Sequence, residues 1–217
     1  GVGSFDGPNA LWRNNGDAIF TDVDAAAGVA SPKNNYGVNF HDLNNDGWVD
    51  IFLPQYNLTV VSEPTSFYLN QGDGTFLNVT QNTDFTVDMG HGMHDLDSDG
   101  YPDALLGTGW PGSELDDVLY WIDPDGQGGI TIEDGSASSG ILGAGPTRCH
   151  GVAYADYDQD GDVDVLLNHG GMGAAVPGSP EESVLWQNQG TGNHWLSVDL
   201  TGVLSPREPV GARVEVE

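Results

Sequence analysis

An acidic nine-residue pattern, D-x-[DN]-x-D-G-x-x-D, occurs three times in this chain. It reads DLNNDGWVD at 42–50, DLDSDGYPD at 95–103 and DYDQDGDVD at 156–164, and we refer to these segments as loops 1, 2 and 3. Calcium takes about six to eight oxygen ligands at roughly 2.3–2.6 Å, and alternate positions of a tight loop can direct oxygens at one centre. The glycine at position 6 permits the sharp turn that such a loop needs. The pattern therefore predicts three Ca²⁺ ions, one in each loop.

Each position of the loop has an expected role. Positions 1, 3, 5 and 9 would supply side-chain oxygens, and position 7 would supply its backbone carbonyl. Without a cation, the clustered carboxylates would raise one another's pKa values and destabilise the fold. The predicted metal-binding residues are Asp42, Asn44, Asp46, Trp48 and Asp50 in loop 1, Asp95, Asp97, Asp99, Tyr101 and Asp103 in loop 2, and Asp156, Asp158, Asp160, Asp162 and Asp164 in loop 3.

The residues after each loop distinguish it from an EF-hand. An EF-hand begins in the same way, but it places a bidentate glutamate at position 12 and lies between helices. Position 12 here is Leu53, Leu106 or Leu167, none of which can bind a cation. The apolar segments IFL, ALL and VLL that follow the loops are typical of strands. The loops are therefore calcium loops within β-structure.

Composition limits the class of protein. The 217 residues are 38% hydrophobic and include 32 glycines and 12 prolines, which favours an all-β fold with many turns; only 22–30 has a helix-compatible sequence. The net charge of −28 would repel nucleic acid and anionic membrane, and no run of residues is long and apolar enough to span a bilayer. We expect neither nucleic acid as a partner nor insertion into a membrane.

The ends of the chain and its cysteine bear on localisation. The sequence does not start with Met and shows no signal peptide, so we interpret it as a mature or trimmed product. Cys149 is the only cysteine, which excludes a disulfide within the chain and leaves a buried thiol or an intermolecular bridge. Calcium loops suit the high calcium concentration outside cells, so we expect a secreted, extracellular protein.

A second unit recurs after each loop. Asn-, Asp- and Gly-rich turns join two apolar segments in predicted hairpins at 66–80, 118–132 and 183–200, and a further copy leads the chain at 10–23. A glycine also lies five residues before each loop, at Gly37, Gly90 and Gly151. One loop and one hairpin give about four strands in roughly 50 residues, which is the size of a β-propeller blade.

The chain therefore divides into repeats. We predict an all-β, propeller-like repeat domain at 1–192, with a leading hairpin at 9–24 and repeats at about 36–85, 89–135 and 150–192, followed by a separate segment at 193–217. Aromatic and aliphatic side chains of the hairpins would pack between neighbouring repeats. These are Leu11, Trp12, Tyr68, Leu69, Tyr120, Trp121, Leu185 and Trp186.

The order of loop and hairpin resembles a known family. The motif G-x-x-x-x-D-L-N-x-D-G-x-x-D-I followed by L-Y-x-N-x-G-D-G-T-F resembles the FG-GAP, or VCBS-like, repeat of integrin-type propellers and of many secreted bacterial proteins, over about residues 9–190. The tail at 193–217, with its N-H-W-L start and G-A-R-V strand, resembles the beginning of an ASPIC/UnbV domain. The resemblance implies a calcium-binding propeller with about seven blades.

The chain has material for only three repeats and a leading hairpin, which predicts an open or incomplete propeller. An open sheet edge is a template for another chain, and the alternating segment ARVEVE at the end suits strand addition to a neighbour. Addition from head to tail without closure gives a filament. Either the chain is a fragment, or a neighbour supplies its missing strands. We expect a structural or adhesive protein, which in the second case assembles with itself into extracellular filaments.

Two other functions compete with assembly. A glycan- or protein-binding module would show an exposed aromatic patch, for which Trp110 is a candidate. An accessory domain of a polysaccharide-processing enzyme would fit similar repeats, and an acid–base pair among Glu114, Asp116, Asp117 and Glu133 stays open. The chain contains no nucleophile elbow, phosphate loop or zinc-protease motif, so we expect that it is not an enzyme.

Three further features leave alternatives. The sequons at Asn57 and Asn78 predict N-glycosylation of an exported protein, with Asn57 favoured because it lies between strand units. The segment 123–134 resembles a broken calcium loop, but a plain hairpin turn is favoured because Thr131 occupies its ninth position. A transition-metal site formed by the histidines at 91, 94, 150 and 169 is conceivable, although a structural role near the blade centre is favoured.

Overall fold

The fold consists of small antiparallel sheets in series along the chain. A computed structural model describes residues 9–31, 35, 37–54, 65–81, 83, 88–109, 116–141, 147–170, 181–193, 196, 198, 200–202 and 214. Its strands are β1 (Trp12–Asn14), β2 (Phe20–Asp22), β3 (Asn39–His41), β4 (Asp50–Leu53), β5 (Ser66–Asn70), β6 (Phe76–Asn78), β7 (Asp88–His94), β8 (Asp103–Thr108), β9 (Val118–Pro124), β10 (Ile130–Asp134), β11 (Cys149–Ala155), β12 (Asp164–His169) and β13 (Val184–Trp186). Two short helices, α1 (Asp24–Ala27) and α2 (Ser136–Ser139), complete the described structure.

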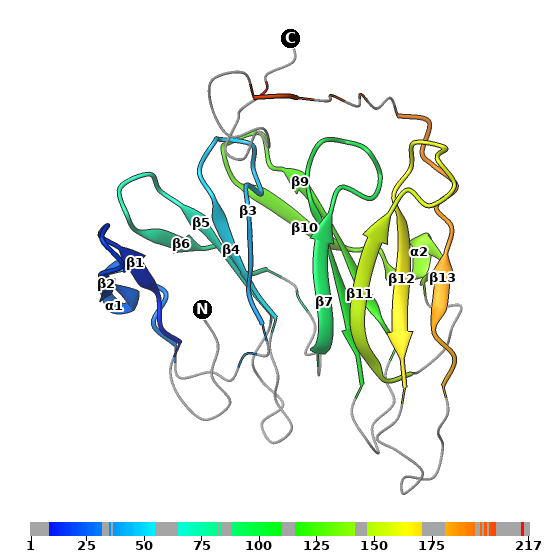
Figure 1. Ribbon diagram of the computed structural model, residues 1–217, viewed down its shortest axis with the longest axis horizontal. Helices are drawn as coiled ribbons and strands as arrows, with labels where there is room; N and C mark the ends of the chain where they lie inside the picture. The colour runs from blue at the N-terminus through cyan, green and yellow to red at the C-terminus, as the bar shows by residue number, and fades with distance from the viewer. Residues whose placement is uncertain are drawn as a thin grey trace, which may run out of the picture.

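Each sheet is a meander in which a strand pairs with the next strand of the chain (Figure 1). The strand orders are β1-β2, β3-β4-β5-β6, β7-β8-β9-β10 and β11-β12-β13, and every pairing is antiparallel. None of these sheets closes on itself within the described residues. The predicted all-β fold with propeller-like repeats is therefore confirmed, and its described part is open.

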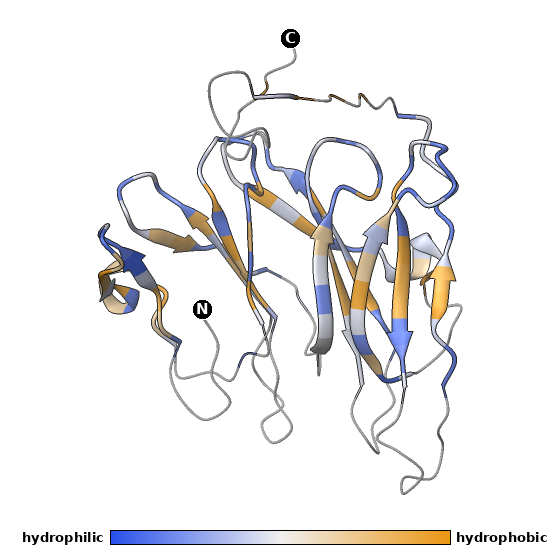
Figure 2. Cartoon of the chain, in the orientation of Figure 1, coloured by the Kyte–Doolittle hydropathy of each residue, from blue (hydrophilic) through white to orange (hydrophobic). Residues whose placement is uncertain are grey.

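The core lies between consecutive sheets, because alternate residues of a middle strand point to opposite faces. In β4, Phe52 contacts the β7–β10 side, whereas Ile51 and Leu53 pack toward the leading segment with Ala27 and Val29. In β8, Ala104 and Leu106 belong to the same core cluster as Phe52. Leu105 points to the other face and belongs to the core cluster shared with the β11–β13 sheet. Figure 2 shows middle strands that are largely hydrophobic and upper connecting loops that are largely hydrophilic.

The predicted packing of the hairpin side chains is wrong only for Trp12 and Leu185, because Leu11, Trp121 and Trp186 also pack against the core. Tyr68, Leu69 and Tyr120 are buried. Trp12 and Leu185 are 51% and 50% exposed, because the outer faces of β1 and β13 have no covering sheet among the described residues. The two short helices contain four residues each, and no helix in the described part is long and apolar enough to cross a membrane.

The recurring glycines lie where the first strands of neighbouring sheets approach each other. β7 and β11 run side by side (Figure 1), and a Cβ added at Gly90 in β7 would lie 2.7 Å from the Cα atom of Gly151 in β11. A Cβ added at Gly37 would overlap the ring of His91 in β7, and one at Gly92 would lie 2.5 Å from the ring of Tyr154. The missing side chain at Gly90 therefore permits close backbone approach, and the missing side chains at Gly37 and Gly92 leave room for neighbouring rings.

This close approach predicts an asymmetric effect of two facing substitutions. Gly90→Ala should destabilise the protein by about 1–3 kcal/mol, because the new methyl group must displace the backbone of β11. Gly151→Ala is the matched control, because a Cβ at Gly151 meets no atom within 4 Å. Thermal unfolding in calcium should therefore show a drop of several degrees for the first variant only. Equal melting temperatures for both variants would contradict the packing.

Candidate calcium sites

The three loops occupy equivalent places in three sheets. Loop 1 connects β3 to β4, loop 2 connects β7 to β8, and loop 3 connects β11 to β12. The loops lie along one edge of the molecule, at the top of Figure 1. The strands on either side of each loop are paired, so the first and last residues of a loop are held at a fixed separation.

The loops share one backbone conformation. The backbone at positions 4 and 6 lies in the left-handed region, which residues other than Gly and Asn rarely adopt. The φ angles at position 4 are 56° for Asn45, 59° for Ser98 and 63° for Gln159, and those at position 6 are 90° for Gly47, 97° for Gly100 and 99° for Gly161. The glycine of the motif is therefore needed for the turn, as the sequence predicts.

The carboxylate at position 1 fixes the turn from inside. In loop 1, Asp42 Oδ1 accepts a hydrogen bond from Asp46 N at 3.1 Å, and Asp42 Oδ2 accepts one from Gly47 N at 2.8 Å. Asp95 makes the same two contacts in loop 2, at 3.1 and 2.9 Å, and Asp156 makes them in loop 3, at 3.1 and 3.0 Å. The two oxygens of position 1 therefore hold the backbone amides of positions 5 and 6 in the turn.

Position 5 directs the second half of the loop. Asp46 Oδ1 accepts a hydrogen bond from Trp48 N at 2.7 Å, and the equivalent bond in loop 2 joins Asp99 Oδ1 to Tyr101 N at 2.8 Å. In loop 3, Asp160 Oδ1 accepts from Asp162 N at 3.0 Å. The amide of position 7 is thus used within the loop, and its carbonyl is the group that the motif assigns to the ion.

The side chains at position 7 lie against hairpin turns. The ring of Trp48 would be 3.0 Å from a Cβ at Gly72, in the turn between β5 and β6. The Asp162 carboxylate occupies the space beside Gly190, in the turn after β13. Both glycines have positive φ angles, so a side chain at either position would be strained as well as crowded. Position 7 therefore connects each of these two loops with the hairpin of its own repeat.

The aspartate at position 9 is buried and binds two separate segments, and we call these three residues the clamp aspartates. Asp50, Asp103 and Asp164 have exposed fractions of 0%, 2% and 1%. In each loop the Oδ2 atom accepts a hydrogen bond from the amide of position 2, at 2.7 Å from Leu43, 2.9 Å from Leu96 and 3.1 Å from Tyr157. The Oδ1 atom accepts from the following hairpin, at 2.7 Å from Asn70, 3.2 Å from Ile122 and 2.8 Å from Asn188. One carboxylate thereby joins the loop, its strand and its hairpin.

Burial makes two of these carboxyl groups, those of Asp50 and Asp103, hard to ionise without a cation. Loss of solvent raises the pKa of Asp50 to about 6 and that of Asp103 to about 8, even though backbone amides act in the opposite direction. Burial, together with the charge of Asp99, raises the pKa of Asp97 in loop 2. A divalent cation would lower all three pKa values, because it favours the charged form of its neighbours.

The predicted ligands converge most clearly in two loops. Oxygen atoms of Asp95, Asp97 and Asp99 lie within 4.8 Å of one another in loop 2, as do those of Asp156, Asp158 and Asp164 in loop 3. Loop 1 has an amide at position 3, and Asn44 Nδ2 donates a hydrogen bond to Asp46 Oδ2 at 3.1 Å. The atoms that would bind a metal in these loops are all oxygens, as a hard cation such as Ca²⁺ requires, so these residues fit the ion.

Sequence reasoning missed one carboxylate at loop 2. Asp123 in β9 interacts with Asp99, and burial followed by this contact raises the Asp123 pKa. The remainder of 123–134 is an ordinary hairpin, in which Asp125 Oδ1 accepts hydrogen bonds from the amides of Gln127 and Gly129 at 2.6 and 2.9 Å. The pairing of β8 with β9 carries Asp123 toward loop 2, and no local motif indicates this contact.

The loops also contact the next repeat. Asn44 Nδ2 donates to Gly128 O at 2.8 Å, in the turn between β9 and β10. The turn after β13 binds loop 2 in the same way, because Thr191 Oγ1 and Asn193 Nδ2 donate to Asp97 O at 2.6 and 2.9 Å. In addition, Asn45 Nδ2 donates to Gly100 O at 2.7 Å, so loops 1 and 2 touch directly. A bound ion in a loop would therefore lie at the junction of two consecutive repeats.

Other residues singled out from the sequence have varied positions. Asn78 is exposed in β6, whereas Asn57, Trp110 and Glu114 lie outside the described residues. Asp116 and Glu133 are exposed, and Asp117 is buried against His169 rather than paired with either of them. The four histidines considered as metal ligands do not form one group in the described structure, where His169 is grouped with Asp117 and Cys149.

Comparisons with known proteins agree with this arrangement. The FG-GAP-like repeat matches residues 2–53 and 95–167, which include all three loops. Cartilage acidic protein 1 of Homo sapiens is 29% identical over 198 residues, the Mus musculus protein is 30% identical over 198 residues, and the Xenopus tropicalis protein is 26% identical over 198 residues. Each alignment covers 88% of this chain, but the chain spans only 28–29% of the length of these relatives.

Burial of Asp103 predicts that the calcium-free protein becomes less stable as the pH rises. In calcium-free protein, folded Asp103 holds its proton up to about pH 8, whereas the unfolded chain releases it near pH 4. The folded state therefore binds more protons in this window, and the free energy of unfolding should fall as pH rises from about 4 to about 8. Urea unfolding in calcium-stripped buffers would measure this slope.

Two variants and calcium serve as controls for this slope. Asp103→Asn should flatten the fall between about pH 6 and pH 8, because the titrating group is gone. Asp116→Asn removes an exposed carboxylate next to the same sheet and should leave the slope unchanged. Saturating calcium should reverse the slope, because the metal requires ionised ligands. A stability that rises with pH in calcium-free wild-type protein would contradict the burial argument.

Proposed function

Because this chain belongs to the FG-GAP-like repeat family, we propose that it is a secreted, calcium-binding β-repeat protein with a structural or adhesive role and no catalytic activity. Three Ca²⁺ ions, one in each loop, would complete the fold. The observation that carries this proposal is the position-9 clamp. Asp50, Asp103 and Asp164 each connect a loop to the segment that follows its strand, and loops 1 and 2 also contact the turn of the next sheet.

In this proposal the ions act by electrostatics and by cross-linking. Positions 1, 3, 5 and 9 would supply carboxylate or amide oxygens, and the carbonyls of Trp48, Tyr101 and Asp162 would complete the coordination. The ions would remove the cost of burying the clamp carboxylates and the repulsion within each cluster. Because loops 1 and 2 also contact the next hairpin turn, ion binding would order consecutive repeats relative to one another.

An extracellular location would supply the required ion. Sensor and extracellular calcium sites bind in the range of about 10⁻⁷ to 10⁻³ M, and the weaker ones are saturated only outside cells. The net charge of −28 fits a soluble surface with bound divalent cations, and the relatives are named for acidity and for cartilage. If the chain is exported through a glycosylating pathway, exposed Asn78 and also Asn57 would be acceptor sites.

A second copy of the chain is the proposed partner. Loop 1 and loop 2 each bind the hairpin turn of the following repeat. By the same arrangement, loop 3 would bind a turn rich in Asn, Asp and Gly, and the turn at 14–17 of a second copy has this composition. The segment ARVEVE and the ASPIC/UnbV-like segment at 193–217, which would add strands to a neighbour, lie largely outside the described residues and stay predictions.

Binding of a glycan or protein is the alternative, and a cavity favours it. A cavity of about 320 Å³ lies between the β7–β10 and β11–β13 sheets. Trp121 and Trp186 line it, and the indole nitrogen of Trp186 is buried without a hydrogen-bond partner among the described atoms. Ser138, Ser139 and Gln189 add polar groups at the same cavity. Aromatic walls with a few polar groups are typical of small-ligand sites, and an accessory domain of a polysaccharide-processing enzyme could use such a site.

Removing one loop carboxylate should lower stability only when calcium is present. Binding to the folded state stabilises it by RT ln(1 + [Ca]/Kd), about 2.7 kcal/mol for one site at a hundredfold excess over Kd. For Asp99→Asn, the rise in melting temperature on adding calcium should therefore be several degrees smaller than for the wild type. A calcium titration of this variant should show two sites in place of three. Alanine at Asp46 or Asp160 should have the same effect in its own loop.

The matched control is Glu133→Gln, which removes one negative charge from an exposed position of β10 in the same sheet. This variant should keep all three sites and the calcium-dependent shift. Wild-type protein whose melting temperature does not change in excess chelator would refute the structural role of calcium.

Electron microscopy would test the proposed partner. In roughly millimolar calcium the protein should form ordered filaments, and these should dissociate on chelation because the loop 3 contact depends on its folded conformation. Separate particles in calcium would contradict self-assembly and would favour the ligand-binding alternative. That alternative predicts a change in tryptophan fluorescence when oligosaccharides occupy the cavity at Trp121 and Trp186.

A further inference from the structure

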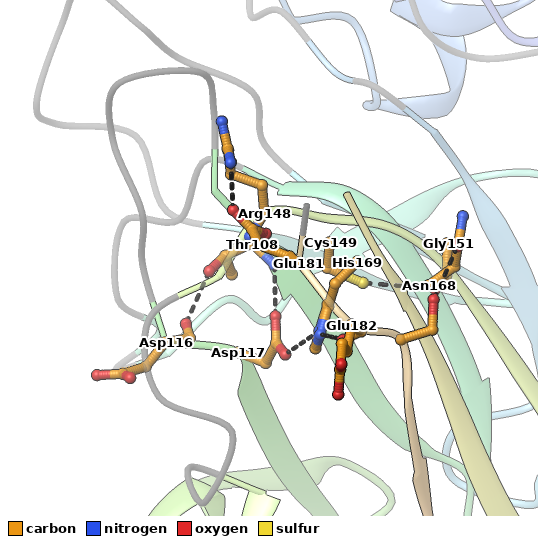
Figure 3. Close-up of polar contacts among 11 residues, drawn as sticks. Thr108, Asp116, Asp117, Arg148, Cys149, Gly151, Asn168, His169, Glu181 and Glu182 are labelled. Carbon is orange, nitrogen blue, oxygen red and sulfur yellow. Dashed lines mark hydrogen bonds and ion pairs between the residues drawn. The ribbon is translucent and has the colours of Figure 1, made fainter. Parts of the chain in front are cut away.

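A second cluster of metal-capable side chains lies at the end of the sheets opposite the calcium loops. Asp117 directly precedes β9, Cys149 is the first residue of β11, and His169 is the last residue of β12 (Figure 3). Their ligand atoms lie within 4.8 Å of one another, and all three residues are buried, with exposed fractions of 2%, 0% and 5%. The cluster therefore joins the β7–β10 sheet to the β11–β13 sheet.

The contacts of His169 determine which of its nitrogens faces the cluster. Nδ1 lies 3.2 Å from the carbonyl oxygen of Glu182, which can only accept, so Nδ1 carries a proton. Nε2 lies 3.2 Å from Asp117 Oδ2. A carboxylate oxygen and an imidazole lone pair repel each other unless a proton or a cation lies between them. A backbone carbonyl that orients the far nitrogen is also the usual support of a metal-bound histidine.

The other two side chains are oriented by their surroundings. Asp117 Oδ1 accepts a hydrogen bond from Thr108 N at 2.9 Å, which turns Oδ2 toward His169. Cys149 lies beside Gly107, where an added Cβ would come within 2.6 Å of the Cys149 Cβ atom, so the glycine provides the space that the thiol occupies. Nearby, the Arg148 guanidinium binds Glu181 (Figure 3). The cluster is thus held by backbone groups of both sheets.

We propose that Asp117, Cys149 and His169 bind one transition-metal ion of the Zn²⁺ class. Thiolate and imidazole are ligands that suit zinc and are unsuited to Ca²⁺, whereas the loops at the opposite edge offer oxygens only. Three protein ligands with water in the fourth position form a common zinc site. Binding releases the thiol proton of Cys149 and the proton between His169 and Asp117 to solvent, and both leave as the metal takes their place.

Such an ion would connect the sheets independently of calcium. The loops join consecutive repeats at one edge through hard oxygen ligands, and this cluster joins two of the same sheets at the other edge. The two kinds of ion would not compete, because their preferred ligands differ. The proposal does not depend on the function proposed above for the calcium loops.

Cobalt titration of the whole, calcium-saturated chain tests this proposal. Co²⁺ replaces zinc and gives a near-ultraviolet charge-transfer band when it binds a thiolate. Since Cys149 is the only cysteine, such a band in wild-type protein must come from this residue, and no variant has to fold for the result to count. We expect one equivalent of Co²⁺ to produce the band and Zn²⁺ to abolish it by competition.

Variants assign the remaining ligands. Asp117→Asn and His169→Gln should weaken Co²⁺ binding at least tenfold, and Cys149→Ser should abolish the band. The matched control is His150→Gln, which changes the residue next to Cys149. His150 Nε2 lies 2.7 Å from Gly170 O, outside the cluster, so this variant should leave the Co²⁺ titration unchanged. The proposal would be overturned if the wild-type protein gave no thiolate band or bound Co²⁺ only through the calcium loops. The contact between His169 and Asp117 would then be explained by a shared proton.

Discussion

The structure depends on the burial of one carboxylate at the end of each acidic loop. Asp50, Asp103 and Asp164 accept two backbone hydrogen bonds each, and through these bonds a loop, a strand and a hairpin meet at a single side chain. Burial makes the charged form costly, as the raised pKa of Asp103 shows. An amide nitrogen could not accept the second of these hydrogen bonds, so both oxygens of the carboxyl group are used, although burial disfavours the charged form of Asp50 and Asp103. In the proposed calcium-bound protein, a cation in the loop would offset this cost.

The arrangement of the sheets follows from a second constraint, the closeness of β7 and β11. Gly90 allows the backbone of β7 to contact that of β11 at Gly151, and Gly107 leaves space for Cys149 at the end of the same interface. Larger residues then fill the widening gap away from this contact, where Leu105 and Leu119 meet Val165 and Leu167. The sheets therefore fan out, with glycine where they converge and branched or aromatic side chains where they diverge. This grading of side-chain size is the packing solution of a propeller-like fold.

The sequence predicts the features that depend on neighbours along the chain. The loop motif predicts turn conformation, because Gly47, Gly100 and Gly161 have the positive φ angles that the pattern requires. It also predicts the all-β class and the hairpins at 10–23, 66–80 and 118–132, whereas the segment 183–200 contributes only β13 among the described residues. It does not predict contacts that form only when sheets assemble: Asp117 and His169 are 52 residues apart, and Asp123 reaches loop 2 through strand pairing. The exposure of Trp12 likewise depends on which face of β1 another sheet covers.

The positions of the polar contacts explain why the loops act on more than their own repeat. Loop 2 is held from two sides, because Asn45 of loop 1 donates to Gly100 O and Asn188 of the third sheet donates to Leu96 O at 2.7 Å. Both acceptors are backbone carbonyls of loop 2. A change in the conformation of one loop must therefore move the hydrogen-bond partners of its neighbours. Under the calcium proposal, the local order that an ion would impose on one loop would reach the neighbouring sheets through these contacts.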